Sequence, residues 1–229
     1  MKRKSKKMRI DEKREKIKNR KLCKKYPFLI PWKGWRMGRY GDYREVYGWK
    51  RGERFSYIMW NFWPRGWNKT IAPLMLEELG EVVKRVQFPK ECHVLDGKEK
   101  WGRLELYFSG PDEAQRIIDK YETISQNVCV RCGKPDVWVI NSGWICPICF
   151  ECFEKDYNNT YNKYLVASAK SSSEEIKKLY DNYRCSDTNL IAESYEVYNF
   201  SPTFPKVTEI NIKPTVEKIR ARWRQKNDY

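Results

Sequence analysis

Residues 129–152 read CVRCGKPDVWVINSGWICPICFEC, and this stretch decides how the middle of the chain folds. Two residues separate Cys129 from Cys132, so both thiolates can face one tetrahedral ion. Gly133 follows directly and lets backbone amides approach the two sulfurs. The pattern predicts a zinc knuckle that supplies two of four thiolate ligands.

The second pair of ligands is ambiguous from spacing. Cys146, Cys149 and Cys152 form two overlapping Cys-x-x-Cys units, whereas a zinc ion bound by the first pair needs only two more ligands. Sixteen residues separate Cys132 from Cys149 and include an apolar run followed by a turn, as a β-hairpin between two knuckles would require. Buried cysteines without a metal are the competing interpretation. A closed four-cysteine site has no position for water, so we expect it to stabilise the fold, by roughly 10 kcal/mol or more, and not to catalyse a reaction.

Composition indicates a globular protein that is neither secreted nor inserted in a membrane. The 229 residues are 41% hydrophobic and 15% aromatic, which excludes the disordered class for the body of the chain. No run of about 18 apolar residues predicts a membrane span, and no secretion signal follows the lysine-rich start. Five of the eight cysteines crowd into 129–152, which favours a metal in a reducing compartment over disulfides. We therefore expect a cytoplasmic protein.

Positive charge is concentrated at the two ends of the chain. The formal net charge is +16, and residues 1–25 hold 14 Lys and Arg against 3 Asp and Glu. Residues 213–229 hold 6 against 2, so the rest of the chain is nearly neutral. A polyanionic partner would therefore meet the ends first.

Hydrophobic periodicity and capping residues predict the helices. Apolar residues recur at helical spacing after Thr70 and after Pro111, and Ser173 is a suitable cap for a later helix. The first helix is so polar that only its last turns are expected to pack. We expect helices over 10–25, 69–87, 111–126, 174–183 and 216–225.

Strand signals are fewer. Two strands, 93–95 and 102–108, flank Asp96-Gly97, a dipeptide suited to a turn with positive φ. One short strand near 54–60 is expected within the irregular, glycine- and tryptophan-rich stretch at 26–67. Residues 186–212 are expected to form loops and extended chain.

Together these elements predict an α+β fold. It combines a small antiparallel sheet and packed helices with an appended four-cysteine zinc-ribbon hairpin and basic helical extensions at both ends. The expected segments are a basic arm at 1–25, an aromatic-rich body at 26–126, the zinc ribbon at 127–155, and a helical and extended C-terminal region at 156–229.

The sequence contains none of the common catalytic motifs. The signatures of zinc proteases, P-loop NTPases and serine hydrolases are absent, and the single histidine, His93, excludes most histidine-dependent chemistry. A zinc deaminase needs glutamate two residues after its histidine, where this chain has Leu95. We therefore expect a protein that is not an enzyme and has no catalytic residues.

Several short motifs carry a family resemblance. They are Glu99–Leu104 with Tyr107, Tyr121-Glu122 with Ser125, Cys129–Pro135, Gly143–Ile145 with the final cysteines, and residues 21–32. On these motifs, which lie between residues 21 and 152, it resembles a group of uncharacterised zinc-ribbon proteins of tailed phages and prophages. In that group the last pair follows Gly-Trp by a short spacer, which implies Cys149 and Cys152 as ligands and Cys146 as an extra cysteine. The resemblance implies a phage origin and a bacterial host cell, but no reaction, ligand or partner.

Basic residues interleaved with aromatic ones predict a protein that binds nucleic acid or a nucleoprotein. RNA and DNA both fit the pattern, and the tryptophans at 32–67 fit either a core or an interface. The alternative is a phage-encoded, anti-CRISPR-like inhibitor that docks on a host defence effector, because tryptophan and tyrosine dominate interface hot spots. The candidate contacts are Lys2, Arg3, Lys4, Lys6, Lys7, Arg9, Trp35, Arg36, Arg39, Tyr40, Arg220, Arg222 and Arg224.

Overall fold

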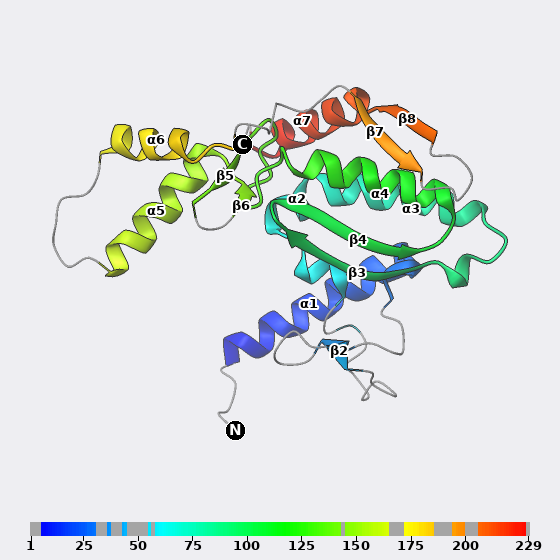
Figure 1. Cartoon of the computed structure of the whole chain (residues 1–229). Helices are drawn as coiled ribbons and strands as arrows, with labels where there is room; N and C mark the ends of the chain where they lie inside the picture. The colour runs from blue at the N-terminus through cyan, green and yellow to red at the C-terminus, as the bar shows by residue number, and fades with distance from the viewer. Residues whose placement is uncertain are drawn as a thin grey trace. The chain divides into compact units, whose positions relative to one another are not determined.

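The fold of the described residues is α+β, as the sequence predicts (Figure 1). The computed structural model describes residues 6–30, 36–37, 43–44, 55, 58–142, 145–164, 172–185, 194–199 and 206–227. The α-helices are α1 (Lys6–Lys25), α2 (Arg65–Lys69), α3 (Ile71–Arg85), α4 (Asp112–Ser125), α5 (Phe150–Tyr164), α6 (Ser173–Asn182) and α7 (Lys213–Asn227). None of the helices in these ranges is long and apolar enough to cross a membrane.

The strands pair as four separate two-stranded sheets. They are β1 (Arg36–Met37) with β2 (Tyr43–Arg44), β3 (His93–Lys100) with β4 (Arg103–Ser109), β5 (Val139–Asn141) with β6 (Ile145–Pro147), and β7 (Ser194–Asn199) with β8 (Lys206–Asn211). Three short 3-10 helices complete the described elements: η1 (Pro27–Leu29), η2 (Met59–Phe62) and η3 (Pro89–Glu91). The chain forms two compact units, the first from residues 1–63, 76–98 and 106–115 and the second from 64–75, 99–105 and 116–229.

Helix α1 is held in the first unit by a polar network. Asn19 is fully buried, and its Nδ2 donates to the carbonyl oxygen of Phe55 and to Oδ1 of Asn61, both at 2.9 Å. Asn61 Nδ2 in turn donates to Glu15 Oε1 at 2.7 Å. Among residues 11–25 the buried side chains are Asn19 and Cys23, both in the last two turns of α1, which agrees with the expectation that only its last turns would pack.

Two tryptophans lie in the core of the first unit. Trp60 and Trp63 are buried, and their ring centroids are 5.8 Å apart. The strand expected near 54–60 is wrong over the described positions, where η2 begins at Met59. The side-chain oxygen of Asn61 accepts from the backbone N–H of Ile58 at 2.9 Å, and this local bond favours a tight turn over a strand ladder.

The turn between β3 and β4 lies at Trp101-Gly102, not at Asp96-Gly97 as the sequence suggested. Trp101 and Gly102 have φ of 49° and 81°, the combination that two-residue hairpin turns require. Gly97 lies inside β3, where a Cβ atom would collide with Trp63 Nε1 and lie 3.0 Å from Leu106 Cδ1. That glycine is therefore needed for close packing and not for a turn.

The second unit encloses a core around the cysteine-rich stretch. The core contains Cys129, Val137, Ile140, Ile148, Cys149, Phe153, Ile176 and Tyr180. The hydroxyl of Tyr180 donates to the carbonyl oxygen of Ile148 at 2.7 Å, so α6 is tied to the segment that precedes α5. Trp67 is also fully buried in this unit, and its Nε1 donates to the carbonyl oxygen of Val128 at 2.8 Å.

Two expectations for the C-terminal half need correction, the cap of α6 and the start of α7. Ser172, not Ser173, caps α6: its side chain accepts from the N–H of Glu175 at 3.2 Å, while the Glu175 side chain accepts from the N–H of Ser172 at 2.8 Å. Within 186–212, where loops and extended chain are expected, the extended chain includes the hairpin β7–β8. Helix α7 begins at Lys213, three residues earlier than expected.

Candidate metal centre

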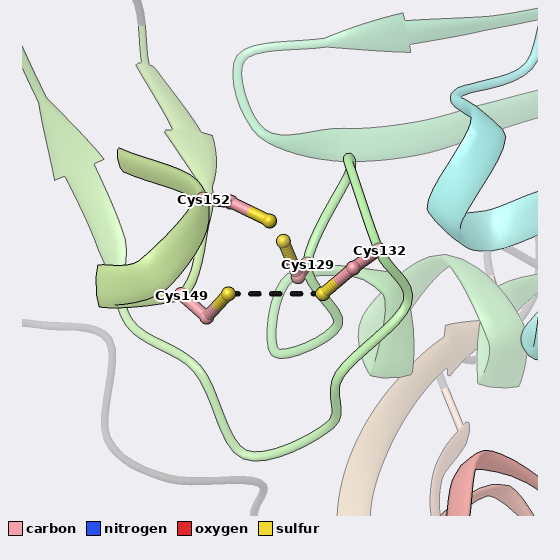
Figure 2. Close-up of side chains that lie close together, drawn as sticks. All are labelled: Cys129, Cys132, Cys149 and Cys152. Carbon is pink, nitrogen blue, oxygen red and sulfur yellow. Dashed lines mark hydrogen bonds between the residues drawn. The ribbon is translucent and has the colours of Figure 1, made fainter. Parts of the chain in front are cut away.

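Four cysteine sulfurs converge on one point in the second unit (Figure 2). The sulfurs of Cys129, Cys132, Cys149 and Cys152 all lie within 4.8 Å of one another, and those of Cys132 and Cys149 are 3.7 Å apart. A tetrahedron of sulfurs at the usual Zn–S distance has edges of about 3.8 Å. A disulfide would need sulfurs about 2 Å apart, so these four thiols fit a metal ion better than a covalent bridge.

The first pair lies on a tight loop that the backbone stabilises. The N–H of Gly133 donates to the carbonyl oxygen of Cys129 at 3.0 Å, and the N–H of Lys134 donates to Cys132 Sγ at 3.4 Å. Gly133 has φ of 87°, a conformation that glycine adopts at little cost. This is the knuckle that the sequence predicts, with one backbone amide directed at a sulfur.

The second pair lies at the start of a helix and not on a second knuckle. Cys149 directly precedes α5, and Cys152 lies in its first turn. The N-terminal end of a helix carries a partial positive charge, which favours thiolates there. Helix α5 is therefore a part of the site that the expectation of a hairpin between two knuckles did not include.

Cys146 lies outside the cluster. It is part of β6, where it pairs with Ile140 of β5, and its side chain packs against the core around the site. Burial raises the pKa of its thiol to about 11, and the carboxylate of Glu99 acts in the same direction. The structure thus brings the first pair together with Cys149 and Cys152, the combination that the phage resemblance implies.

The four sulfurs influence one another's ionisation strongly. Hydrogen bonds from Cys132 and Cys149 hold the pKa of Cys129 well below that of an ordinary thiol. The same interaction with Cys129 raises the pKa of Cys149, and burial raises the pKa of Cys152 to about 12. Four neighbouring thiolates repel one another, so a divalent cation at their centre would allow all four to ionise together.

Helix α2 packs closely against the backbone of the knuckle. The N–H of Gly66 donates to the carbonyl oxygen of Val130 at 2.8 Å. A Cβ atom on Gly66 would collide with the carbonyl oxygen of Cys129 and lie 2.6 Å from the nitrogen of Gly133. No motif indicated this glycine, because the contact joins segments more than sixty residues apart in sequence.

Helix α7 is attached beside the knuckle by an arginine. Arg220 binds Asp136 with two hydrogen bonds, Nε to Oδ2 at 2.8 Å and Nη2 to Oδ1 at 2.7 Å, and also pairs with Glu217. These carboxylates raise the pKa of its guanidinium. Arg222 Nε donates to the carbonyl oxygen of Lys69 at 3.4 Å, whereas Arg224 is exposed. Of the three predicted binding arginines of this helix, Arg220 and Arg222 therefore contact other residues of the protein.

The other predicted contacts are only partly visible. Lys6, Lys7 and Arg9 belong to α1 and Arg36 to β1, but their side chains are not among those described. Lys2, Arg3, Lys4, Trp35, Arg39 and Tyr40 lie outside the described residues.

The exposed face of α1 carries basic residues that the candidate contacts did not include. Between residues 11 and 25 the exposed positions hold seven cations, one carboxylate and one isoleucine. The cations are Lys13, Arg14, Lys18, Arg20, Lys21, Lys24 and Lys25. We call this set the basic face of α1.

No family model, curated protein or solved structure matches the chain.

Proposed function

We propose that the protein is a non-enzymatic binder of nucleic acid or nucleoprotein, organised by one structural zinc ion. The observation that supports binding is the basic face of α1 on a helix anchored by Asn19. The observation that supports zinc is the cluster of four cysteine thiols.

The chemistry of the site favours zinc over other common metals. Magnesium and calcium prefer oxygen ligands, whereas four thiolates in a tetrahedron suit zinc. The knuckle, the hairpin β5–β6 and helix α5 follow one another along the chain, so one ion would join a loop to the first turn of a helix. All four coordination positions would be occupied by protein, so the ion would serve the fold and activate no water.

Metal analysis of purified variants tests this part of the proposal. The wild-type chain and Cys146→Ser are expected to contain one zinc per chain by mass spectrometry, and Cys149→Ser much less. Cys146→Ser is the matched control because its thiol packs beside the site but lies outside the cluster. Equal zinc loss in both variants would contradict the assignment of ligands.

The basic face of α1 suits a phosphate backbone. Two of its lysines have carboxylate neighbours, Lys18 with Glu15 at 3.5 Å and Lys25 with Glu77 at 3.7 Å, but both pairs are exposed and therefore weak. A polyphosphate can compete with such partners and release its own counterions, which makes binding steeply dependent on salt. The exposed positions between residues 11 and 25 hold no aromatic side chain, so contacts there would not include stacking on bases.

Salt titration with matched charge variants tests the binding proposal. Lys13, Arg14, Lys21 and Lys24 are changed to Gln together, and binding to a fluorescein-labelled 20-nucleotide strand is measured by anisotropy at several salt concentrations. The slope of log affinity against log salt is expected to become shallower by roughly 0.7–0.9 for each phosphate that the variant no longer neutralises. The control variant changes Lys84, Lys90, Lys155 and Lys178 to Gln, which removes the same charge from positions elsewhere in the chain.

Two results would count against the proposal. Equal slopes in the two variants would show that only total charge matters and that the basic face of α1 is not the site. Absence of nucleic-acid binding, together with a protein partner retained after nuclease treatment of a host lysate, would favour the inhibitor that docks on a host defence effector.

A further inference from the structure

The tip of the β3–β4 hairpin presents a tryptophan to solvent. Trp101 is 73% exposed, the highest value among the large hydrophobic side chains that the structure describes as exposed. Tryptophan is usually buried in folded proteins, as Trp67 is here. An indole left in water is therefore a candidate contact for a partner.

The backbone under this tryptophan is firmly held. The N–H of Gly102 donates to Glu99 Oε1 at 2.7 Å. The glycine also lies against the hairpin β5–β6, since a Cβ atom there would be 3.3 Å from Pro147 and 3.4 Å from the Cα of Cys146. Beyond the turn, the N–H of Leu104 donates to the hydroxyl oxygen of Ser125 at 2.8 Å. The backbone that carries the indole is thus already ordered before a partner binds, so binding need not order the turn.

The neighbours of the indole are charged. Lys100 Nζ lies 4.7 Å from the centre of the Trp101 ring and 3.4 Å from Glu105 Oε1. Arg103, on the other side of the turn, pairs with Glu122 at 2.6 Å. Anchor tryptophans of protein interfaces are usually enclosed by neighbours that exclude water, and these charged flanks do not provide such a rim. An aromatic plane beside a cation instead matches a base and its phosphate.

We propose that Trp101 stacks on an unpaired base of single-stranded nucleic acid and that Lys100 contacts the adjacent phosphate. This inference rests on the proposed function, in which the protein binds nucleic acid. The bases of a duplex are already stacked on each other, so the tip distinguishes single strands from duplexes. The 2′-hydroxyl is not needed for stacking, so oligo(dT) and oligo(rU) are both ligands of this kind.

The test compares Trp101→Ala, Trp101→Phe and the wild-type chain on three labelled probes: 20-nucleotide oligo(dT), oligo(rU) and a 20-base-pair duplex. Alanine is expected to weaken single-strand binding by roughly 5- to 100-fold and to leave duplex binding unchanged, while phenylalanine retains most of the affinity. The salt slope is expected to stay constant because the indole carries no charge. Phe88→Ala is the matched control, since Phe88 is 58% exposed and distant from the turn in sequence.

The possible outcomes separate the two proposals. If the wild-type chain binds the strands and Trp101→Ala binds them equally well, the stacking inference is wrong and the proposed function stands. If Trp101→Ala loses single-strand and duplex binding in parallel, the tip has a structural role and the inference also fails. If the wild-type chain binds none of the probes, both proposals fail. Zinc content and melting temperature of each variant show whether folding is unchanged.

Discussion

Replacing Gly66 with alanine should damage the metal centre without touching a ligand side chain. The added methyl group would point into the backbone of the knuckle, colliding with the carbonyl oxygen of Cys129 and approaching the nitrogen of Gly133 to 2.6 Å and the carbonyl carbon of Val130 to 2.9 Å. All three atoms belong to the main chain, so no flexible side chain can move aside. Helix α2 or the knuckle must shift by on the order of 1 Å to restore ordinary contact.

The expected cost follows from three contributions. Overpacking against a rigid neighbour costs about 1–3 kcal/mol. The bond from Gly66 N–H to Val130 and the bond from Gly133 N–H to Cys129 would each lose part of a net value of about 0.5–1.5 kcal/mol. Alanine regains up to about 1 kcal/mol through its higher helix propensity. The balance is a loss of about 2–4 kcal/mol, which in a chain of this length lowers the melting temperature by about 5–15 °C.

Gly80→Ala provides a matched control, because Gly80 also lies within a helix. Its added methyl group would meet only the ring edge of Tyr26, at 3.3 Å, so the strain should be much smaller than at Gly66 and stability should change by at most about 1 kcal/mol. The measurements are melting temperature and zinc affinity by competition with a chromogenic chelator, where we expect Gly66→Ala to bind zinc about 10- to 100-fold more weakly. Wild-type stability and affinity in Gly66→Ala would refute the claim that α2 supports the knuckle.

Three further perturbations have defined outcomes. Lowering the pH from 7.5 to 5 should release zinc, because protons compete with the metal for the thiolates; a chelator dye measures the release, and full retention at pH 5 would contradict a thiolate site. Arg220→Ala should lower the free energy of unfolding by about 1 kcal/mol, because the ion pair with Asp136 is partly exposed. It should also speed tryptic cleavage within α7. Cleavage equal to that of the control Arg224→Ala would show that the contact with Asp136 does not secure the helix. Tyr180→Phe should lower the free energy of unfolding by about 1–3 kcal/mol, because the carbonyl of Ile148 loses its hydrogen-bond donor. Thermal unfolding measures the loss, with Tyr183→Phe as the more exposed control.

Local patterns in the sequence are sufficient to predict α3 and α4. Each has a continuous apolar stripe, and the structure places them at Ile71–Arg85 and Asp112–Ser125, within two residues of the expected bounds. The first ligand pair is equally predictable, because two cysteines and a glycine define a knuckle within five residues. In these regions the interactions that decide the structure are close in sequence.

The wrong predictions fall where distant contacts decide the structure. Asp96-Gly97 has the composition of a turn, but Trp63, more than thirty residues earlier, requires a glycine inside the strand. The burial of the last turns of α1 agrees with the sequence, but the partners of Asn19, which are Phe55 and Asn61, could not be predicted from the local pattern. The second cysteine pair has the spacing of a knuckle, but the polar and aromatic residues that follow it continue as α5.

The contact between Gly66 and the knuckle has a consequence for anyone who wishes to cut or transplant the metal centre. All four cysteines lie within 24 consecutive residues, so that stretch looks like a fragment that could be transferred to another protein. The surface beneath the loop comes from a segment encoded far upstream, however, and it admits no side chain larger than a hydrogen atom. A peptide made from 129–152 alone would leave that surface behind, so a useful minimal fragment has to reach back past Pro64.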